Sequence, residues 1–440
     1  MKEFSAVRNT IYSGANVAIS PILMIGVTPV LLSSLGSEQY AIWILVNSFI
    51  ASLAIFNFGA SDVIVKYVSL YNSRGEERKV YEVLSTISGL QGMSFLGLYG
   101  VLCGLRFFFP EKLNSYMDLA NVSFALFFFR QFEQILYAFL KGLERFGLVS
   151  LFSITSKALF FSTQAVVALK TNNVTYVIAS ACCASALGLA VEAYILKIVI
   201  PRVLFIRAFS VRCAKEFFHF GSWNWLGSAA SMLGAHSDKW IVTGLWGLKA
   251  FAPYSLGILV FNQLHTVLAA SVSWIFPSIS IAGDSPKVLA KKYHNSTITV
   301  CISSYVISGL LCSFSGIFSL WLGKEMYQES ALYINLFLAA LPVFAMSIVP
   351  YYFLLGLGLV REKFIIDLMA LFLKIVLVTF SVATLESQFL PPMFLVFISA
   401  QCFFYLRRVS WEVGVNPAPL MFLLAFNVAV SLVRMGLYVY

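Results

Sequence analysis

Residues 330–357 read SALYINLFLAALPVFAMSIVPYYFLLGL, a stretch without an acidic or basic side chain. An α-helix crosses the hydrocarbon core of a bilayer with about 20 apolar residues. The stretch is longer than that and is apolar on every face. It therefore predicts a membrane-spanning helix and not a strand of a membrane barrel, in which apolar and polar residues alternate.

The rest of the chain has the same character. Its 440 residues are 60% hydrophobic and 11% charged, and Phe alone occurs 41 times. Soluble domains carry about 25% charged residues. This composition indicates an integral membrane protein and excludes a soluble core, a disordered chain and a nucleic-acid-binding domain.

Charged residues, Gly and Pro divide the sequence into apolar windows that are each long enough for a membrane-spanning helix. An all-α integral membrane protein of about 12 transmembrane helices is expected. A further apolar stretch, 417–439, predicts a C-terminal helix whose insertion the sequence leaves open, because Arg434 lies near its end. The twelve windows are 10–33, 39–62, 83–105, 117–140, 147–169, 174–196, 217–246, 252–281, 295–321, 330–357, 364–385 and 389–406.

The Lys and Arg residues between these helices set the orientation, because basic loops resist translocation across the membrane. With the N-terminus in the cytoplasm, 20 of them lie in inner loops. Only five then lie in outer loops, at Arg106, Lys112, Lys170, Lys249 and Lys324. We therefore predict a cytoplasmic N-terminus.

Short pieces of sequence recur between the two halves of the chain at offsets of 213 or 214 residues. The recurring pieces are Lys2-Glu3-Phe4 with Lys215-Glu216-Phe217, Tyr40 with Tyr254, and Leu140-Lys141-Gly142-Leu143 with Leu354-Leu355-Gly356-Leu357. They predict two six-helix bundles, residues 1–207 and 208–408, followed by an apolar tail helix, 409–440. Two such bundles enter the membrane in the same direction and enclose a central cavity, as in alternating-access transporters.

Four basic residues lie inside the predicted helices: Arg130, Lys157, Lys239 and Lys374. On insertion scales each costs at least about 2.5–3.5 kcal/mol at a helix centre, so each should face water, a partner or a bound anion. Arg130 lies one turn before Glu133, and the alternative interpretation is a pair that neutralises itself. Lys157 has no acidic residue in its own helix and needs a partner from elsewhere.

Polar side chains accompany these cations at helical spacing. Asp238 and Lys239 form either a gate or an interfacial packing pair, and His265 is either a proton relay or a packing residue. Together these faces predict a wet, net-basic cavity for a phosphate-bearing ligand. The substrate-binding candidates are Arg130, Lys157, Lys374, Gln164, Asn224 and Asn262, and the gating or coupling candidates are Glu133, Asp238, Lys239, His265 and Asp367.

Motifs for other chemistry are missing from the sequence. It contains no P-loop, no HExxH and no GxSxG, and its seven cysteines include no CxxC. We expect no catalytic residue, metal or cofactor. Gly100 and Gly104 form a GxxxG motif, which predicts close packing of two helices.

Several ordered pieces resemble the bacterial polysaccharide flippases, especially the O-antigen unit flippases, of the multidrug/oligosaccharidyl-lipid/polysaccharide exporter superfamily. The resemblance covers roughly residues 1–365, and Asn57 stands where the family usually has an acidic residue. The resembling pieces are Leu35-Gly36-Ser37-Glu38-Gln39-Tyr40-Ala41-Ile42-Trp43, Phe56-Asn57-Phe58-Gly59-Ala60, Lys141-Gly142-Leu143-Glu144-Arg145-Phe146, Phe220-Gly221, Asp238-Lys239 and Pro253-Tyr254-Ser255.

This resemblance implies a transporter that moves an undecaprenyl-diphosphate-linked oligosaccharide across the bacterial inner membrane by alternating access. It also implies a possible coupling ion, H⁺ or Na⁺, and polysaccharide polymerase machinery as a partner. A cation-coupled small-molecule exporter of the same superfamily is the alternative function. A membrane-bound oligosaccharide polymerase is a weaker alternative, because the longest outer connection, about 106–116, is too short to hold an acceptor sugar.

Overall fold

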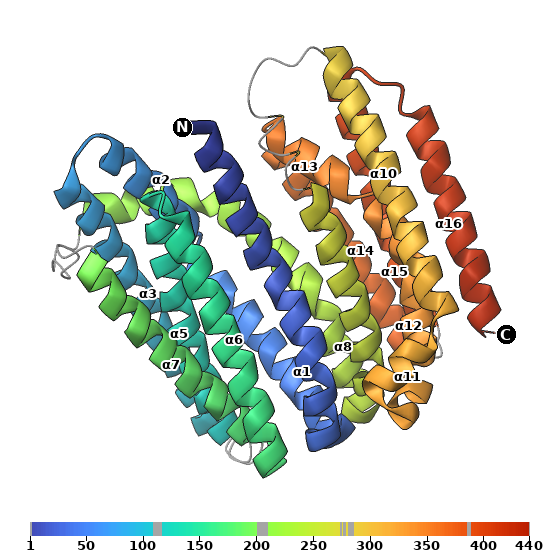
Figure 1. Cartoon of the computed structure of the whole chain (residues 1–440), viewed down its shortest axis with the longest axis horizontal. Coiled ribbons are helices and arrows are strands. Elements are labelled where there is room, and N and C mark those ends of the chain that lie inside the picture. The colour runs from blue at the N-terminus through green and yellow to red at the C-terminus, as the bar shows by residue number, and fades with distance from the viewer. Residues whose placement is uncertain are drawn as a thin grey trace. The chain divides into compact units, whose positions relative to one another are not determined.

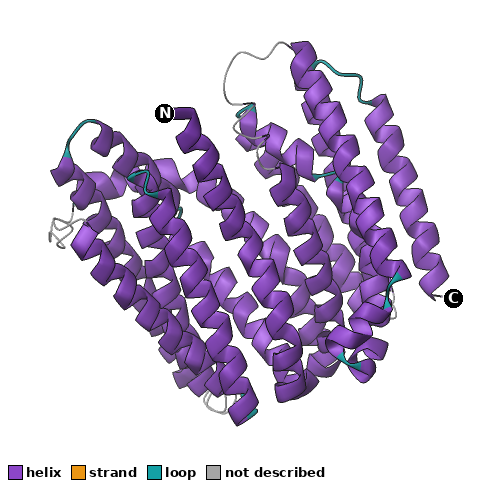
Figure 2. Ribbon diagram, viewed as in Figure 1, coloured by secondary structure: helices purple, strands orange, loops and turns teal. Residues whose placement is uncertain are grey.

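The computed structural model describes residues 2–108, 117–199, 210–272, 275, 279, 286–384 and 389–439. Within these residues the chain is helical, with short turns and no strand (Figure 2). Ten of the described helical segments are long and apolar enough to cross a membrane. The prediction of an all-α membrane protein is confirmed.

The chain divides into two compact units, residues 1–232 and 233–440, and α8 (Val211–Val272) contributes to both. The predicted boundary after residue 207 lies outside the described residues. The helices of the first unit are α1 (Lys2–Leu53), the 3₁₀ helix η1 (Ala54–Asn57), α2 (Ala60–Ser73), α3 (Glu77–Phe108), α5 (Met117–Gly142), α6 (Phe146–Thr171) and α7 (Val174–Val199) (Figure 1).

The second unit is centred on the apolar stretch of residues 330–357. That stretch forms most of α12 (Lys324–Ala345) and α13 (Ile348–Gly356), and its side chains from Leu336 to Leu341 are almost fully buried. The other helices of this unit are α10 (Pro286–Ser313), α11 (Gly316–Leu322), α14 (Val360–Thr384), α15 (Leu390–Val413) and α16 (Ala418–Val439).

The C-terminal helix α16 is an integral part of the second unit. It packs against α12 and α15, and its Asn427 is fully buried. The Asn427 amide donates to the Cys301 sulfur at 3.2 Å and accepts a hydrogen bond from the Tyr305 hydroxyl at 2.6 Å. Arg434 donates to the Ser308 hydroxyl at 3.1 Å, so its charge lies against α10.

Two glycines break the longest helices where the sequence predicts the first turn of each half. Gly36 has φ 73° and ψ 169°, and Gly247 has φ 81° and ψ 176°, a region that only glycine occupies readily. Each break separates two helical arms of α1 or of α8. The tyrosines that follow, Tyr40 and Tyr254, are both fully buried.

A second pair of matching turns follows α5 and α13. Arg145 N–H donates to the Leu140 carbonyl at 2.9 Å, and Leu359 N–H donates to the Leu354 carbonyl at 2.8 Å. The residues just before these donors, Glu144 and Gly358, both have positive φ. The sequence repeat at an offset of 214 residues therefore corresponds to a repeat of local backbone structure.

The window 39–62 predicts one uninterrupted helix, and this prediction is wrong. Phe58 (φ 49°) and Gly59 (φ 76°) adopt left-handed conformations, so the helix stops at η1 and restarts as α2. Asp62 lies in the first turn of α2, which continues to Ser73. Residues at this interruption, Asn57 and Gly59, line a cavity in the first unit.

Candidate functional site

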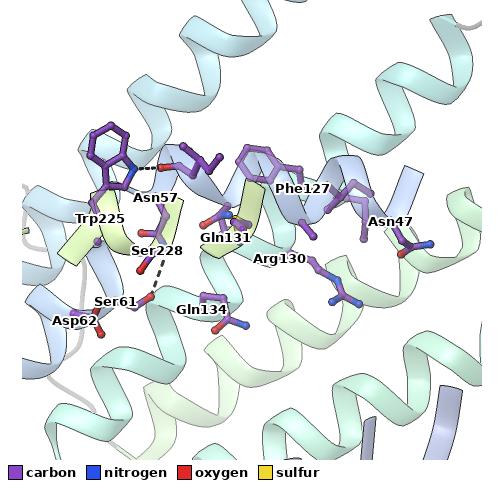
Figure 3. A pocket seen from close by; sticks show the side chains of 16 residues that line it. Asn47, Asn57, Ser61, Asp62, Phe127, Arg130, Gln131, Gln134, Trp225 and Ser228 are labelled. Carbon is purple, nitrogen blue, oxygen red and sulfur yellow. Dashed lines mark hydrogen bonds between the residues drawn. The ribbon is translucent and has the colours of Figure 1, made fainter. Parts of the chain in front are cut away.

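The first unit contains a cavity of about 410 Å³, which is lined by both polar and apolar side chains. Its walls come from the second arm of α1, η1, the start of α2, the middle of α5 and the α8 segment that carries Trp225 (Figure 3). The polar or charged lining residues are Asn47, Asn57, Ser61, Asp62, Arg130, Gln131, Gln134 and Ser228, and the aromatic ones are Phe127 and Trp225.

The helix interruption at Phe58 and Gly59 forms one wall of this cavity. A broken helix inside a membrane leaves backbone carbonyls that side chains must satisfy. The Trp225 indole N–H donates to the Ile55 carbonyl, and the Gln91 amide donates to the Asn57 carbonyl at 2.9 Å. Side chains from α8 and α3 therefore hold the break open as a stable feature of the fold.

Arg130 brings a positive charge to the cavity wall. Its guanidinium carbon lies 4.0 Å from the centre of the Phe160 ring, a cation–π contact from α5 to α6. The Glu133 carboxylate instead accepts a hydrogen bond from the Ser156 hydroxyl at 2.7 Å. Among the described lining residues, Arg130 is the one cation and Asp62 the one acid.

The other predicted residues of the first unit lie outside the lining of this cavity. Lys157 is half-buried on α6, next to Ser156 and within electrostatic range of Arg130. Gln164 is fully buried and accepts a hydrogen bond at 2.5 Å from the Trp43 indole, which ties α6 to α1. Asn224 belongs to α8, but its side chain lies outside the described residues.

In the second unit, Lys374 and Asp238 form a buried ion pair. The Lys374 ammonium lies 2.6 Å from an Asp238 oxygen, and these side chains are 6% and 0% exposed. The ammonium also donates to the Gly234 carbonyl and lies 4.8 Å from the centre of the Phe394 ring. The Tyr254 hydroxyl donates to the other Asp238 oxygen at 2.5 Å.

The expected pairing of Asp238 with Lys239 is therefore replaced by a pairing with Lys374. Neighbouring residues on a helix point in different directions, so Asp238 and Lys239 face different surroundings. The Lys239 ammonium lies 3.4 Å from a ring nitrogen of His236.

Asp367 is the centre of a second buried cluster in the same unit. Its carboxylate accepts hydrogen bonds from Lys363 at 2.6 Å, from Gln401 at 2.8 Å and from the Tyr405 hydroxyl. The Lys363 ammonium also lies 4.7 Å from the Tyr351 ring. Asp367 and Lys374, two turns apart on α14, thus have different partners.

The last two predicted residues lie on the second arm of α8. Asn262 is exposed, and His265 stacks on Phe261 with ring centres 6.0 Å apart. Among the described residues, no group of three His, Cys, Asp or Glu side chains could hold a metal ion.

Four of these polar and aromatic lining residues were missed by the reasoning from sequence: Ser61, Phe127, Gln131 and Trp225. Gln131 directly follows Arg130, and Trp225 directly follows the candidate Asn224, so each lies beside a predicted site residue in the sequence. The missing information was the break at Phe58 and Gly59, which borders the space that these side chains line.

Comparison with known proteins gives one family and several relatives. Residues 6–282 match the family described as polysaccharide biosynthesis protein. A Shigella flexneri protein named "Putative O-antigen transporter" is 23% identical over 375 residues, covering 80% of this chain and 85% of its own. The membrane protein EpsK of Bacillus subtilis is 23% identical over 368 residues, covering 76% of this chain and 70% of its own.

Solved structures of low sequence identity share the fold. One is the inward-facing conformation of a multidrug resistance MATE family transporter of the MOP superfamily. Its TM-score is 0.64 at 13% identity, with 95% of each chain covered.

Proposed function

The chain belongs to the polysaccharide biosynthesis protein family, and from this premise we propose that it is a flippase for an undecaprenyl-diphosphate-linked oligosaccharide. It is a multi-pass membrane transporter and not an enzyme. We place it in the bacterial inner membrane with its N-terminus in the cytoplasm. Its cargo would be a repeat unit of O-antigen or of a similar surface polysaccharide.

The observation that carries this proposal is a guanidinium on the wall of a cavity lined by amides. A guanidinium binds phosphate oxygens through two parallel hydrogen bonds. Lys157 lies within electrostatic range of Arg130. Lys157 lies outside the lining of the cavity, and its charge would strengthen the positive potential that Arg130 presents to a diphosphate group.

The rest of the cavity suits a sugar. The amides of Asn47, Gln131 and Gln134 can donate to and accept from sugar hydroxyls. Phe127 and Trp225 offer aromatic faces to the apolar side of a sugar ring. The lipid tail would stay in the bilayer, next to the apolar outer faces of the helices.

The proposal extends to the other candidate residues, which would act during the same transport cycle. We assign Lys374 to substrate contact in a state in which it has left Asp238, and the pair then acts as a gate. Gln164, Asn224 and Asn262 remain proposed polar contacts along the path.

The first test removes the charge of Arg130. Arg130→Ala should lower surface polysaccharide at least about tenfold in a strain that lacks its own flippase, because hydrogen bonds to charged groups contribute about 1.5–3 kcal/mol. Arg130→Lys should retain part of the activity. The readouts are surface polysaccharide, accumulated lipid-linked oligosaccharide and the amount of protein in the membrane.

The exposed residue Arg407 supplies the matched control. Arg407→Ala should leave all three readouts unchanged. Normal surface polysaccharide in the Arg130→Ala strain would rule out Arg130 as the diphosphate contact.

The second test concerns Lys157. Lys157→Ala should abolish surface polysaccharide at normal protein level. Lys157→Arg should be partly tolerated, because it keeps the positive charge but replaces a compact ammonium by a planar guanidinium. Lys170→Ala, an exposed lysine at the end of the same helix, is the control. Full activity of Lys157→Ala would remove this lysine from the site.

A further inference from the structure

A polar seam joins α10 and α16, which lie side by side in the second unit (Figure 1). On α16, polar side chains recur at spacings of four, three and four residues, which places them on one face of the helix. A stripe with the same spacings runs along α10. The two stripes are Asn427, Ser431, Arg434 and Tyr438 on α16, and Cys301, Tyr305, Ser308 and Cys312 on α10.

The contacts across the seam follow the same order along both helices, so the two helices run in parallel. The Asn427 amide donates to the Cys301 sulfur at 3.2 Å. Further along, the Arg434 guanidinium donates to the Ser308 hydroxyl at 3.1 Å and to the Cys312 sulfur at 3.4 Å. Arg434 is therefore the charge at the end of the seam toward which both helices run.

The partners of Arg434 at this seam are uncharged. A guanidinium carries a full positive charge and five N–H donors, and two of these donors are used by the hydroxyl and the thiol. The Tyr438 hydroxyl lies within electrostatic range. Arg434 makes no ion pair among the described residues. An arginine within a membrane helix calls for an anion, and this one has donors left to bind it.

The side chains beside Arg434 face lipid. Leu437 on α16 and Leu310 on α10 are 76% and 55% exposed, and exposed apolar side chains of membrane helices lie against acyl chains. Arg434 precedes the last residue of α16, Val439, by five positions, which is about 7.5 Å along the helix axis. A side chain as long as arginine reaches the level of the lipid headgroups from there.

We propose that Arg434 binds the phosphate of an anionic phospholipid, such as phosphatidylglycerol, at this end of the seam between α10 and α16. A guanidinium binds two phosphate oxygens through parallel hydrogen bonds, and the Tyr438 hydroxyl can donate a third. The acyl chains would lie along the exposed apolar faces of the two helices. In the orientation proposed above, this lipid belongs to the outer leaflet.

The missing negative charge favours an anionic lipid over a zwitterionic one. The ammonium group of phosphatidylethanolamine would lie beside the Arg434 charge and be repelled by it, whereas phosphatidylglycerol brings a phosphate without a cation. Basic pockets between membrane helices bind anionic headgroups in this way. The site lies in the second unit and does not depend on the cargo proposed above.

Native mass spectrometry of the full-length protein tests the site, with the protein stripped of lipid in detergent and then titrated with one phospholipid at a time. The wild-type protein should bind phosphatidylglycerol about tenfold more tightly than phosphatidylethanolamine. Arg434→Gln should lose this preference, because a charge-assisted hydrogen bond is about twice as strong as a neutral one. Arg434→Lys should keep the preference with weaker binding, because an ammonium lacks the planar fork.

Ser308→Ala is the matched control, because it removes the same bond between the helices but leaves the guanidinium in place. Lys170→Ala removes an exposed cation from the side of the membrane predicted for Arg434. Both variants should keep the wild-type preference. Equal loss of the preference in Ser308→Ala and Arg434→Gln would assign lipid binding to the packing of the seam and overturn the role of the charge.

A wild-type protein that does not prefer phosphatidylglycerol overturns the proposal even if Arg434→Gln does not fold. A folded Arg434→Gln protein that keeps the preference also overturns it. Two further titrations test the source of the phosphate. Displacement of phosphatidylglycerol by an equal concentration of inorganic phosphate would show a simple anion site, and tighter binding of undecaprenyl phosphate would assign the seam to the cargo, so either result overturns the assignment to a phospholipid.

Discussion

At the scale of single residues, the membrane interior accepts charge only where neighbours offset it. Lys374 is surrounded by the Asp238 carboxylate, the Gly234 carbonyl and the Phe394 ring. The sequence showed that both charges lie inside helices, but not that they pair, because 136 residues separate them. Partners so distant in the chain follow from helix packing, which a hydrophobicity pattern does not specify.

Removing one member of this pair should destabilise the second unit. Asp238→Ala leaves a buried ammonium without its counter-ion and should lower the free energy of unfolding by about 3–5 kcal/mol. The double variant Asp238→Ala with Lys374→Ala should lose less than the sum of the two single variants, because neither charge is then left unpaired. Thermal unfolding of the detergent-solubilised protein measures both.

The partly exposed pair of Arg408 and Glu412 is the comparison, with an N–O distance of 2.8 Å. Glu412→Ala should change the free energy of unfolding by no more than about 1 kcal/mol. If Asp238→Ala and Glu412→Ala lowered the free energy of unfolding equally, burial would not be what makes the Asp238–Lys374 pair important for stability.

At the scale of helices, the close approaches are made by glycines at repeated positions. A Cβ atom on Gly142 would lie 2.7 Å from the Val68 Cβ, and one on Gly356 would lie 2.9 Å from the Ile279 Cβ. The repeat of sequence thus has a steric reason in each unit. The close packing predicted for the GxxxG motif of Gly100 and Gly104 is wrong, since among the described residues no atom of another helix lies within 4 Å of a Cβ at either position.

Substitutions at these glycines should therefore have opposite effects. Gly142→Ala overpacks the contact between α5 and α2 and should cost about 1–3 kcal/mol. Gly100→Ala meets open space within a helix and should stabilise the protein by roughly 0.5–1 kcal/mol. Thermal unfolding distinguishes the two, and a neutral Gly142→Ala would show that Val68 moves aside without cost.

At the scale of the whole molecule, composition and helix length were sufficient to predict the fold class. The glycine breaks at Gly36 and Gly247 also agree with the predicted turns. The cavity was predicted only in part: its cation, Arg130, was identified from its cost in a bilayer. The break at Phe58 and Gly59 was not, since nothing in an apolar window marks a left-handed phenylalanine.

Orientation in the membrane is also a property of the whole chain, and labelling can measure it. In a variant whose native cysteines are replaced by serine, Lys249→Cys should react with a membrane-impermeant thiol reagent added to intact cells whose outer membrane has been permeabilised. Arg145→Cys should react only after the inner membrane is opened. Both side chains are exposed, so burial does not explain a difference. The reverse pattern would overturn the cytoplasmic N-terminus.

The interruption between α1 and α2 also decides which polar groups share the cavity. The chain is anchored on both sides of it, because Trp43 binds Gln164 before the break and Val68 lies against Gly142 after it. Asn57 and Asp62 both line the cavity. In a continuous helix two residues five positions apart point about 140° away from each other, so the break is what lets an amide and a carboxylate face one chamber.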